Sequence, residues 1–269
     1  MGEPWWRTAC RDLLGLVLPV GCAGCGQDDI AWCPRCAAAL DRPAWRAEGR
    51  AGRLDPMDGR PPLPVWAVAD FAGPVRRAVS AWKDHGRADL TPVLGAAACR
   101  ATSALVDEAW ASLVGGGPTP APVGAARSRG RLVVGHTGRS AGDVPVLVVP
   151  APSTPAARRA RGWDPAGALA AAVADELRRR GVPARVATVL RRAPGADQAG
   201  LSARARSRNL AGRVHVRRWP GVSPGRAVLV DDVLTTGATF AACVRALSGS
   251  RIAVLAGVVV ASTPSPGAP

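Results

Sequence analysis

The sequence predicts an α/β fold, in which a mainly parallel sheet is flanked by helices and follows a small cysteine-rich module. Apolar runs rich in Val and Leu alternate with helical patterns across residues 65–262, which is typical of parallel sheets. Polar loops follow two of these runs, at 150–155 and 231–239. Four cysteines in two close pairs lie within the first 40 residues.

The chain has 269 residues and a formal charge of +15, carried almost wholly by arginine. A basic surface favours anionic partners such as phosphorylated ligands or nucleic acid; a solvated surface without a dedicated partner is an equal alternative. No apolar stretch is long enough to span a bilayer. The short apolar run 13–20 leads into the cysteines without a signal-peptide cleavage site, so we expect a cytoplasmic protein.

Residues 1–40 combine the hydrophobic N-terminal segment with a C-x2-C-x7-C-x2-C pattern formed by Cys22, Cys25, Cys33 and Cys36. Each pair places two thiolates on one tight turn, and two such turns complete a tetrahedral zinc shell. Two disulfides or two redox pairs are the alternatives, disfavoured by a reducing cytosol and by the lack of a surrounding βαβ pattern. Four sulfur ligands leave no open position, so we predict a structural zinc ribbon.

Residues 41–64 are rich in Arg, Gly and Pro without periodicity, which predicts a linker or a long exposed loop. The main domain then spans 65–262. It should open with a strand at 65–71 and a helix that starts at Gly73-Pro74 and closes near Lys83. A second, Ala-rich helix should cover 90–114.

Residues 115–143 contain a Gly-Gly-Gly run with scattered Pro, Arg and Ser, which predicts a disordered insertion. Order should resume with a strand at 146–150, a helix from Asp164-Pro165 to about Arg180, and strands at 185–190 and 252–261. The Ser/Thr/Pro-rich end at 263–269 predicts a loose tail.

The stretch 228–239 reads Val-Leu-Val-Asp-Asp-Val-Leu-Thr-Thr-Gly-Ala-Thr. It predicts a buried strand ended by two acids, then a small-residue turn and a helix N-terminus. Such a turn is an anion site, because backbone N–H groups and the helix dipole both favour negative charge. Hydroxyls add donors and glycine admits a close backbone approach; the candidate phosphate ligands are Thr235, Thr236, Gly237, Ala238 and Thr239.

Asp231 and Asp232 would repel a bare phosphate, but acceptor-only carboxylates suit the two hydroxyls of a ribose. An ordinary polar turn with a helix cap is the plainer alternative. Because ligands of parallel sheets lie beyond the strand carboxyl ends, the loop after Val149 should share this edge. It brings Ser153, Arg158 and Arg161 as further phosphate ligands. Lys83 is one more candidate phosphate ligand. Gln198, Arg204 and Arg208 lie in either a mobile phosphate-closing segment or a solvated basic helix.

The acidic pair with Thr-Thr-Gly-Ala-Thr resembles the PRPP-binding signature of type I phosphoribosyltransferases. With the cysteine pairs, Gly-Pro-Val-Arg-Arg, the Lys-x-x-Gly at Lys83, Arg-x-Arg-Gly-Trp and Gln-Ala-Gly-Leu-Ser, the chain resembles the ComF family, which includes GntX-type members. Two departures are Asp84 after the lysine and Trp163-Asp164-Pro165 in place of Phe-Asn-Gln. They affect the acceptor side of the site more than the PRPP side.

The resemblance implies a type I phosphoribosyltransferase fold that binds PRPP with Mg²⁺, where Asp231 and Asp232 hold the ribose hydroxyls and stabilise an oxocarbenium-like transition state. It also implies a competence protein acting on incoming single-stranded DNA with an uptake helicase. Two alternatives are a nucleobase or small-molecule phosphoribosyltransferase of salvage metabolism, and a non-catalytic PRPP-regulated nucleic-acid-binding module.

Overall fold

The computed structural model describes residues 20–114, 144–193, 213–217 and 225–265. Its main sheet has seven strands in the order β1-β2-β9-β8-β4-β5, with β3 beside β9. All pairs in this sheet are parallel except β1 with β2, so the predicted mainly parallel α/β sheet is confirmed. The bounds are β1 Trp45–Arg46, β2 Val65–Ala67, β3 Ala69–Asp70, β4 Val146–Pro150, β5 Ala184–Val186, β8 Gly225–Leu234 and β9 Ile252–Ser262.

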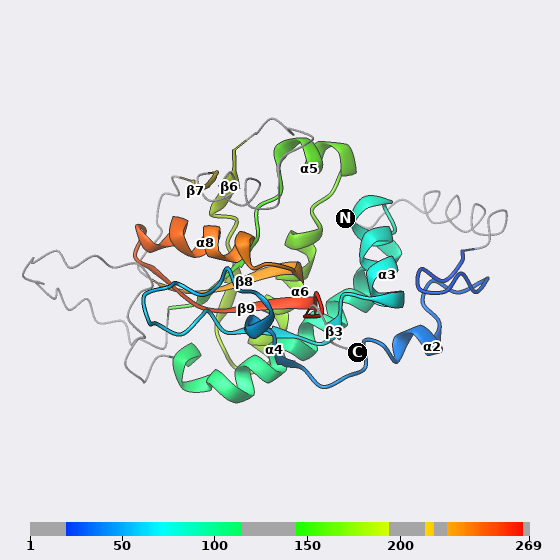
Figure 1. The fold of residues 1–269 in the computed structure, drawn as a ribbon, viewed down its shortest axis with the longest axis horizontal. Helices are drawn as coiled ribbons and strands as arrows, with labels where there is room; N and C mark the ends of the chain where they lie inside the picture. The colour runs from blue at the N-terminus through cyan, green and yellow to red at the C-terminus, as the bar shows by residue number, and fades with distance from the viewer. Residues whose placement is uncertain (1–19, 115–143, 194–212, 218–224, 266–269) are drawn as a thin grey trace, which may run out of the picture.

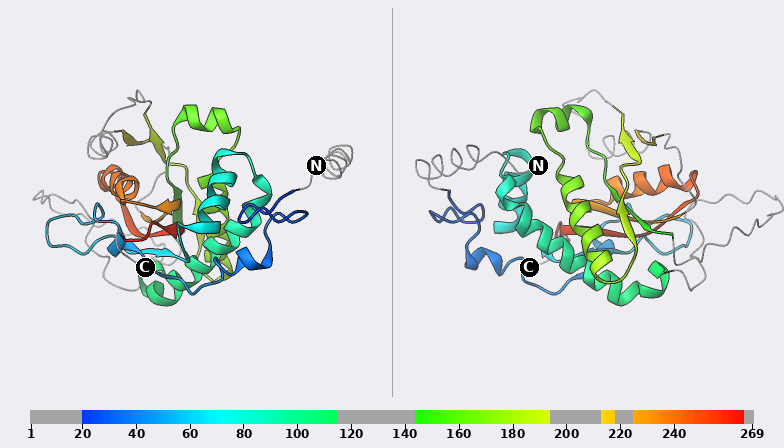
Figure 2. Two further views of the ribbon diagram at one scale, coloured as in Figure 1. Left: turned by 45° about the vertical axis from the view of Figure 1, so that its right-hand side comes forward. Right: turned by 180° about the vertical axis from the view of Figure 1, so that it is seen from behind.

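Helices cover both faces of the sheet, and Figure 1 shows α8 and α4 on opposite sides of β8 and β9. Helix α6 joins α4 on its face, as the view from behind shows (Figure 2). The longer helices are α3 Gly73–Asp84, α4 Thr91–Val114, α6 Pro165–Arg179 and α8 Ala238–Ser248; the short ones are α2 Pro34–Ala37, α5 Pro155–Arg161, η1 Glu48–Arg50 and η2 Ala88–Leu90.

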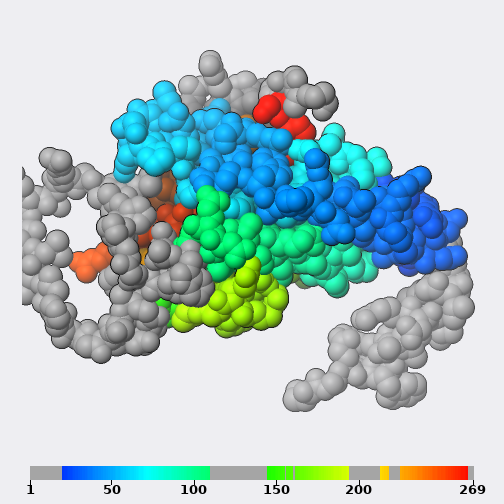
Figure 3. All heavy atoms as spheres, turned by 90° about the horizontal axis from the view of Figure 1, so that it is seen from below, coloured from blue at the N-terminus to red at the C-terminus, as the bar shows by residue number. Residues whose placement is uncertain are grey.

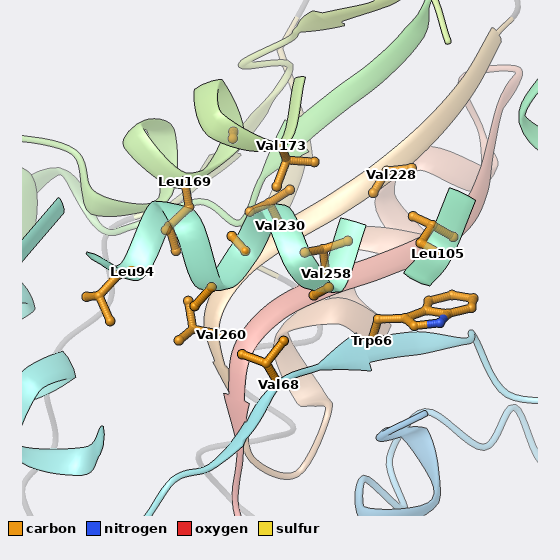
Figure 4. Packing of buried hydrophobic residues seen from close by; sticks show 14 of the residues in the cluster. Trp66, Val68, Leu94, Leu105, Leu169, Val173, Val228, Val230, Val258 and Val260 are labelled. Atoms are coloured by element: carbon orange, nitrogen blue, oxygen red, sulfur yellow. The ribbon is translucent and has the colours of Figure 1, made fainter. Parts of the chain in front are cut away.

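Side chains alternate between two hydrophobic cores along the central strands, as a two-residue period requires. Val228 and Val230 of β8 pack with Leu169 and Val173 of α6 (Figure 4). Leu229, between them, packs in the second core, which also contains residues of α8. Both faces of the central strands are therefore covered, which explains why their sequences are continuous apolar runs of Val and Leu and do not alternate with polar residues.

The two central crossovers leave the sheet in opposite directions. Helix α6 leads from β4 outwards to β5, whereas α8 leads from β8 to β9 on the other side of the sheet. Strand β8 pairs with β4 only from Ala227 to Val230, but stays paired with β9 to Leu234. A crevice at the carboxyl ends of β4 and β8 is where sheets of this kind bind ligands.

Three expectations about elements need correction. Residues 185–190 do not form one strand: β5 stays in the main sheet, whereas β6 Leu190–Arg192 pairs with β7 Val214–Val216 in a separate two-stranded sheet. The two acids do not end β8, because its ladder with β9 continues past them.

The third concerns 41–64, which is only partly a loose segment. Strand β1 extends the main sheet, and Ala47, Ala51 and Leu54 are buried in the core on the α8 side. Its regular elements are only the two-residue β1 and the three-residue η1, which are too short to give a periodic pattern in the sequence.

The cysteine-bearing segment lies at one end of the molecule (Figure 3, dark blue). Two arginines hold it against the main domain. Arg77 Nε of α3 donates to the Gly24 carbonyl at 2.5 Å, and Arg87 Nη1 donates to the Gly21 carbonyl at 3.0 Å. Among the helices that the structure describes, none combines the length and apolar character needed to cross a membrane.

Candidate functional site

A small pocket of ≈ 30 Å³ lies at the turn between the end of β8 and the start of α8. The strand ends at Leu234, two exposed threonines make the turn, and the helix begins at Ala238. The pocket is lined by Asp231, Thr235, Gly237, Ala238 and Thr239, among others. Thr236 lies in the turn without lining the pocket; its hydroxyl accepts from the Ala238 N–H at 3.4 Å. Helix N–H groups and hydroxyls at this point suit an anion.

Gly237 is required here by its backbone and by its neighbours. It has φ +79°, a left-handed conformation that side chains disfavour. A Cβ at this position would lie 2.6 Å from Leu54 Cγ and 3.1 Å from Ala51 Cβ. The contact that demands glycine is therefore with the 51–54 segment, which differs from the expected close approach of a ligand.

The two acids lie in successive positions of β8 and so belong to opposite faces of the sheet. Asp231 follows the alternation of Leu229 and lines the pocket beside α8. Asp232 follows Val228 and Val230 and is 4% exposed. The Asp232 N–H donates to Asp231 Oδ1 at 2.9 Å, which ties the two groups together locally.

Asp232 of β8 forms an ion pair with Lys83 of α3. Lys83 Nζ lies 2.9 Å from Asp232 Oδ1 and 2.6 Å from Oδ2. Burial alone lowers the pKa of Lys83, but the negative charges of Asp232 and Asp231 outweigh it, and the pKa is raised. Lys83 therefore carries a positive charge beside the acidic pair at neutral pH.

The pKa of Asp231 is raised well above its ordinary value. Burial is the main cause and the charge of Asp232 adds to it, while Lys83 opposes both. The nearby thiol of Cys243 in α8 also has a raised pKa, through burial and then the charge of Asp231. A carboxyl with a raised pKa can donate as well as accept a hydrogen bond, which widens the range of ligand groups it can contact.

Two buried donors near Lys83 have no hydrogen-bond partner among the described residues. They are Arg161 Nη1 and Trp163 Nε1. The Trp163 ring packs edge-on against Trp82, next to Lys83 in the chain, with centroids 4.9 Å apart. Arg161 is close enough to Lys83 for its positive charge to lower the pKa of the lysine, against the larger effect of the aspartates. Buried donors without a partner are uncommon, so an anionic or carbonyl-bearing ligand would satisfy them.

A second, larger pocket of ≈ 300 Å³ follows the end of β4. Thr154 caps the start of α5, its hydroxyl accepting from the Ala157 N–H at 3.1 Å, and Gly162 caps its end at φ +70°. This helix was not predicted, although a Thr-Pro start and a glycine stop indicated it. The pocket is lined by Ser153, Arg158, Asp164, Arg191, Arg192 and Arg217, among others.

Arg191, Arg192 and Arg217 were missed by the sequence analysis. They come from β6 and the residue after β7, which meet only through the two-stranded sheet. An excess of arginines over the single acid makes this pocket strongly anion-attracting.

The four cysteines Cys22, Cys25, Cys33 and Cys36 come together as predicted, with their sulfur atoms all within 4.8 Å of one another. This is a fitting donor set for one zinc ion. The segment is built tightly: a Cβ on Gly24 would lie 2.5 Å from Cys36 Sγ. Four sulfur atoms this close together could share one zinc ion.

The sulfur environments in this cluster differ. Burial raises the pKa of Cys22, but N–H groups of Cys33, Gly24 and Cys25 outweigh this and lower it to about 6. Burial and the neighbouring sulfurs raise the pKa of Cys36 to about 12. A bound cation would compensate the clustered thiolates.

Gln198, Arg204 and Arg208, predicted as a basic segment over the site, lie outside the described residues. The N-terminal apolar run 13–20 falls outside them too, except for its last residue, as do the predicted insertion 115–143 and the last four residues. Compared with known protein-family models and with curated protein sequences, the chain matches none.

Proposed function

We propose that the chain is a phosphoribosyltransferase-fold protein that binds PRPP with Mg²⁺ at the carboxyl ends of β4 and β8. The observation that carries the proposal is the pocket that Asp231 shares with Thr235, Gly237, Ala238 and Thr239 of the turn. An acid and a phosphate-binding helix start at one opening match the two ends of a ribose 5-phosphate: the hydroxyls and the phosphate.

The arginine-lined pocket after β4 fits the other charged part of PRPP. Its pyrophosphate needs several cations, and Arg158, Arg191 and Arg217 supply fixed positive charge there. Mg²⁺, when bound with the ligand, supplies a hard cation that neutralises phosphate oxygens. Asp231 would contact ribose hydroxyls directly, whereas Asp232 would act from the opposite face together with Lys83.

In a transfer reaction the bond from the anomeric carbon to pyrophosphate breaks, and a bond to the acceptor forms. Positive charge develops on the ribose ring as pyrophosphate leaves. Asp232 favours that charge electrostatically, Asp231 does so in its ionised form, and the arginines favour the departing anion. The unpartnered donors of Arg161 and Trp163 lie on the Lys83 side, where they suit the acceptor or the pyrophosphate.

The resemblance to the ComF family extends the proposal to natural competence: a cytoplasmic protein that handles incoming single-stranded DNA together with a helicase. The basic pocket supports an anionic partner of this kind. Salvage phosphoribosyl transfer to a nucleobase is the second candidate, favoured by a site able to support both halves of PRPP. For the cysteine cluster we propose a structural zinc ribbon, because it offers four sulfur ligands.

The proposal is tested by calorimetric titration of PRPP with Mg²⁺ into the full-length protein. Asp231→Asn should weaken binding by about tenfold or more, since one of the two oxygens that accept from the ribose hydroxyls is replaced by an NH2 group. Asp175→Asn, an exposed acid of α6 paired with Arg178, is the matched control and should bind like the wild type. Equal affinity of Asp231→Asn and wild type would refute the site; product formation with a nucleobase panel separates salvage from competence.

A further inference from the structure

A third pocket, of ≈ 250 Å³, lies outside the proposed PRPP site. It is formed between the 53–63 segment and the outer face of α8. Its volume is below the range of about 300–1,000 Å³ typical of drug-sized ligand sites. It therefore suits a ligand of one or two rings rather than a nucleotide.

The walls of this pocket are apolar. Leu54, Leu63 and Val244 line it and are themselves almost fully buried. Prolines of the 53–63 segment add further apolar surface with a fixed backbone. Such walls favour a flat apolar body by removing it from water.

The rim of the pocket offers positive charge. The side chains of Arg53 and Arg245 line it and make no hydrogen bond or ion pair with any residue that the structure describes. Of the acids on the same rim, Asp58 is paired with Arg60, whereas Asp55 accepts the neutral Met57 N–H at 2.8 Å and keeps its negative charge. Three arginines against two aspartates leave one positive charge in excess at this rim, which favours a carboxylate or phosphate.

The same segment is attached to the phosphate turn. The Arg53 N–H donates to the Thr236 carbonyl at 3.1 Å. Leu54 lines the pocket on one side and lies against Gly237 on the other, close enough to exclude a Cβ there. A ligand that moves Leu54 must therefore also move the turn that begins α8.

We propose that this pocket binds a small organic anion with an apolar ring, such as an aromatic carboxylate, and that its occupancy changes the affinity of the phosphate turn. The first part stands by itself. The second part rests on the proposed function, because it concerns PRPP. Thermodynamic linkage makes the coupling reciprocal: PRPP changes the affinity for the ring anion by the same factor.

The binding test uses 2-naphthoate as the probe and methyl NMR of the full-length protein as the readout. Saturable shifts are expected at Leu54, Leu63 and Val244. The double substitution Arg53→Gln with Arg245→Gln should raise the Kd by about tenfold, since both charge-assisted contacts are lost. Arg76→Gln, an exposed arginine of α3, is the control and should leave the Kd unchanged.

Two further probes separate charge from ring. The neutral 2-naphthalenemethanol should bind more weakly than 2-naphthoate, and acetate should give no saturable shift at these methyl groups. Ala241→Leu, which fills the pocket without changing charge, should abolish binding. Unsaturable shifts, or an unchanged Kd in the double arginine variant, would overturn the proposal.

The coupling test adds two observations. The Gly237 amide should shift on binding of 2-naphthoate, and calorimetry should give different PRPP affinities with and without the probe. Naphthoate binding without any PRPP binding refutes the proposed function and leaves the pocket standing. PRPP binding without naphthoate binding refutes the pocket alone, and binding of both with no mutual effect refutes the coupling.

Discussion

Lys83 and Asp232 form an ion pair at 2.6–2.9 Å although they lie 149 positions apart along the chain. The pair joins the last turn of α3 to the carboxyl-terminal part of β8. The Asp232 side chain is 6% exposed and that of Lys83 is 36% exposed, so the carboxylate depends on the ammonium far more than the reverse. The only lysine of an arginine-rich chain thus stands beside the acidic pair.

Lys83→Met is expected to lower the free energy of unfolding. It leaves a buried carboxylate without its cation, at a cost of about 1–3 kcal/mol once the partial exposure of the lysine is allowed for. Urea unfolding at pH 7 measures the loss. Adding Asp232→Asn to Lys83→Met should recover part of it, whereas Lys83→Met as stable as the wild type would contradict the role of the pair.

Stability should fall as pH rises from the ordinary titration range of an aspartate into the raised range of Asp231. With its pKa raised in the folded state, Asp231 keeps its proton while the unfolded chain loses it, so the folded state binds more protons in this window. Asp231→Asn should remove this slope. The free energy of unfolding of wild type and Asp231→Asn, measured at pH values between about 4 and 8, tests this prediction. The same pH dependence in both proteins would show that the pKa of Asp231 is not raised.

The cysteine cluster is expected to carry one zinc ion per chain, since its four sulfur atoms lie within 4.8 Å of one another. Metal analysis of the purified protein should find it. Cys33→Ser should lose the metal, and Cys99→Ser, at a half-buried position outside the cluster, should retain it. Full zinc content in Cys33→Ser would mean that the metal is held elsewhere.

Gly237→Ala is expected to destabilise the protein by about 1–2 kcal/mol from the left-handed backbone alone, with more from the clash with Leu54. Thermal unfolding measures the effect. Gly249→Ala is the matched control at the other end of α8, because its φ is −83° and no atom lies within 4 Å of the added Cβ. Similar melting temperatures for the two variants would count against this account of the turn.

The sheet and the phosphate turn were predictable because their information is local. A run such as 228–230 specifies a buried strand, and small residues after it specify the turn. The separation of Asp231 from Asp232 was missed for one reason: the acids were expected to end the strand. Once the ladder with β9 continues through them, alternation sends them to opposite faces.

Long-range pairing explains most of what the sequence did not predict. Arg191 and Arg217 reach one pocket only because β6 pairs with β7, and nothing in either short segment specifies its partner. Similarly, the alanines near residue 50 are unremarkable in the sequence until the shape of the core makes small side chains necessary there. The pair of Lys83 with Asp232 joins residues whose neighbours in the chain give no sign of contact.

The ladder on β9 has a mechanical consequence for the acids. Asp231 lies opposite Val259 and Val233 opposite Ala261, so the main chain of both aspartates is hydrogen-bonded to a central strand. The Lys83 ammonium that faces Asp232 sits instead at the end of four rotatable methylene groups in the last turn of α3. When a ligand binds, the Lys83 side chain should therefore change its conformation, whereas the two aspartates should keep their positions. Structures obtained with different occupants should superpose at the acids and diverge at the lysine.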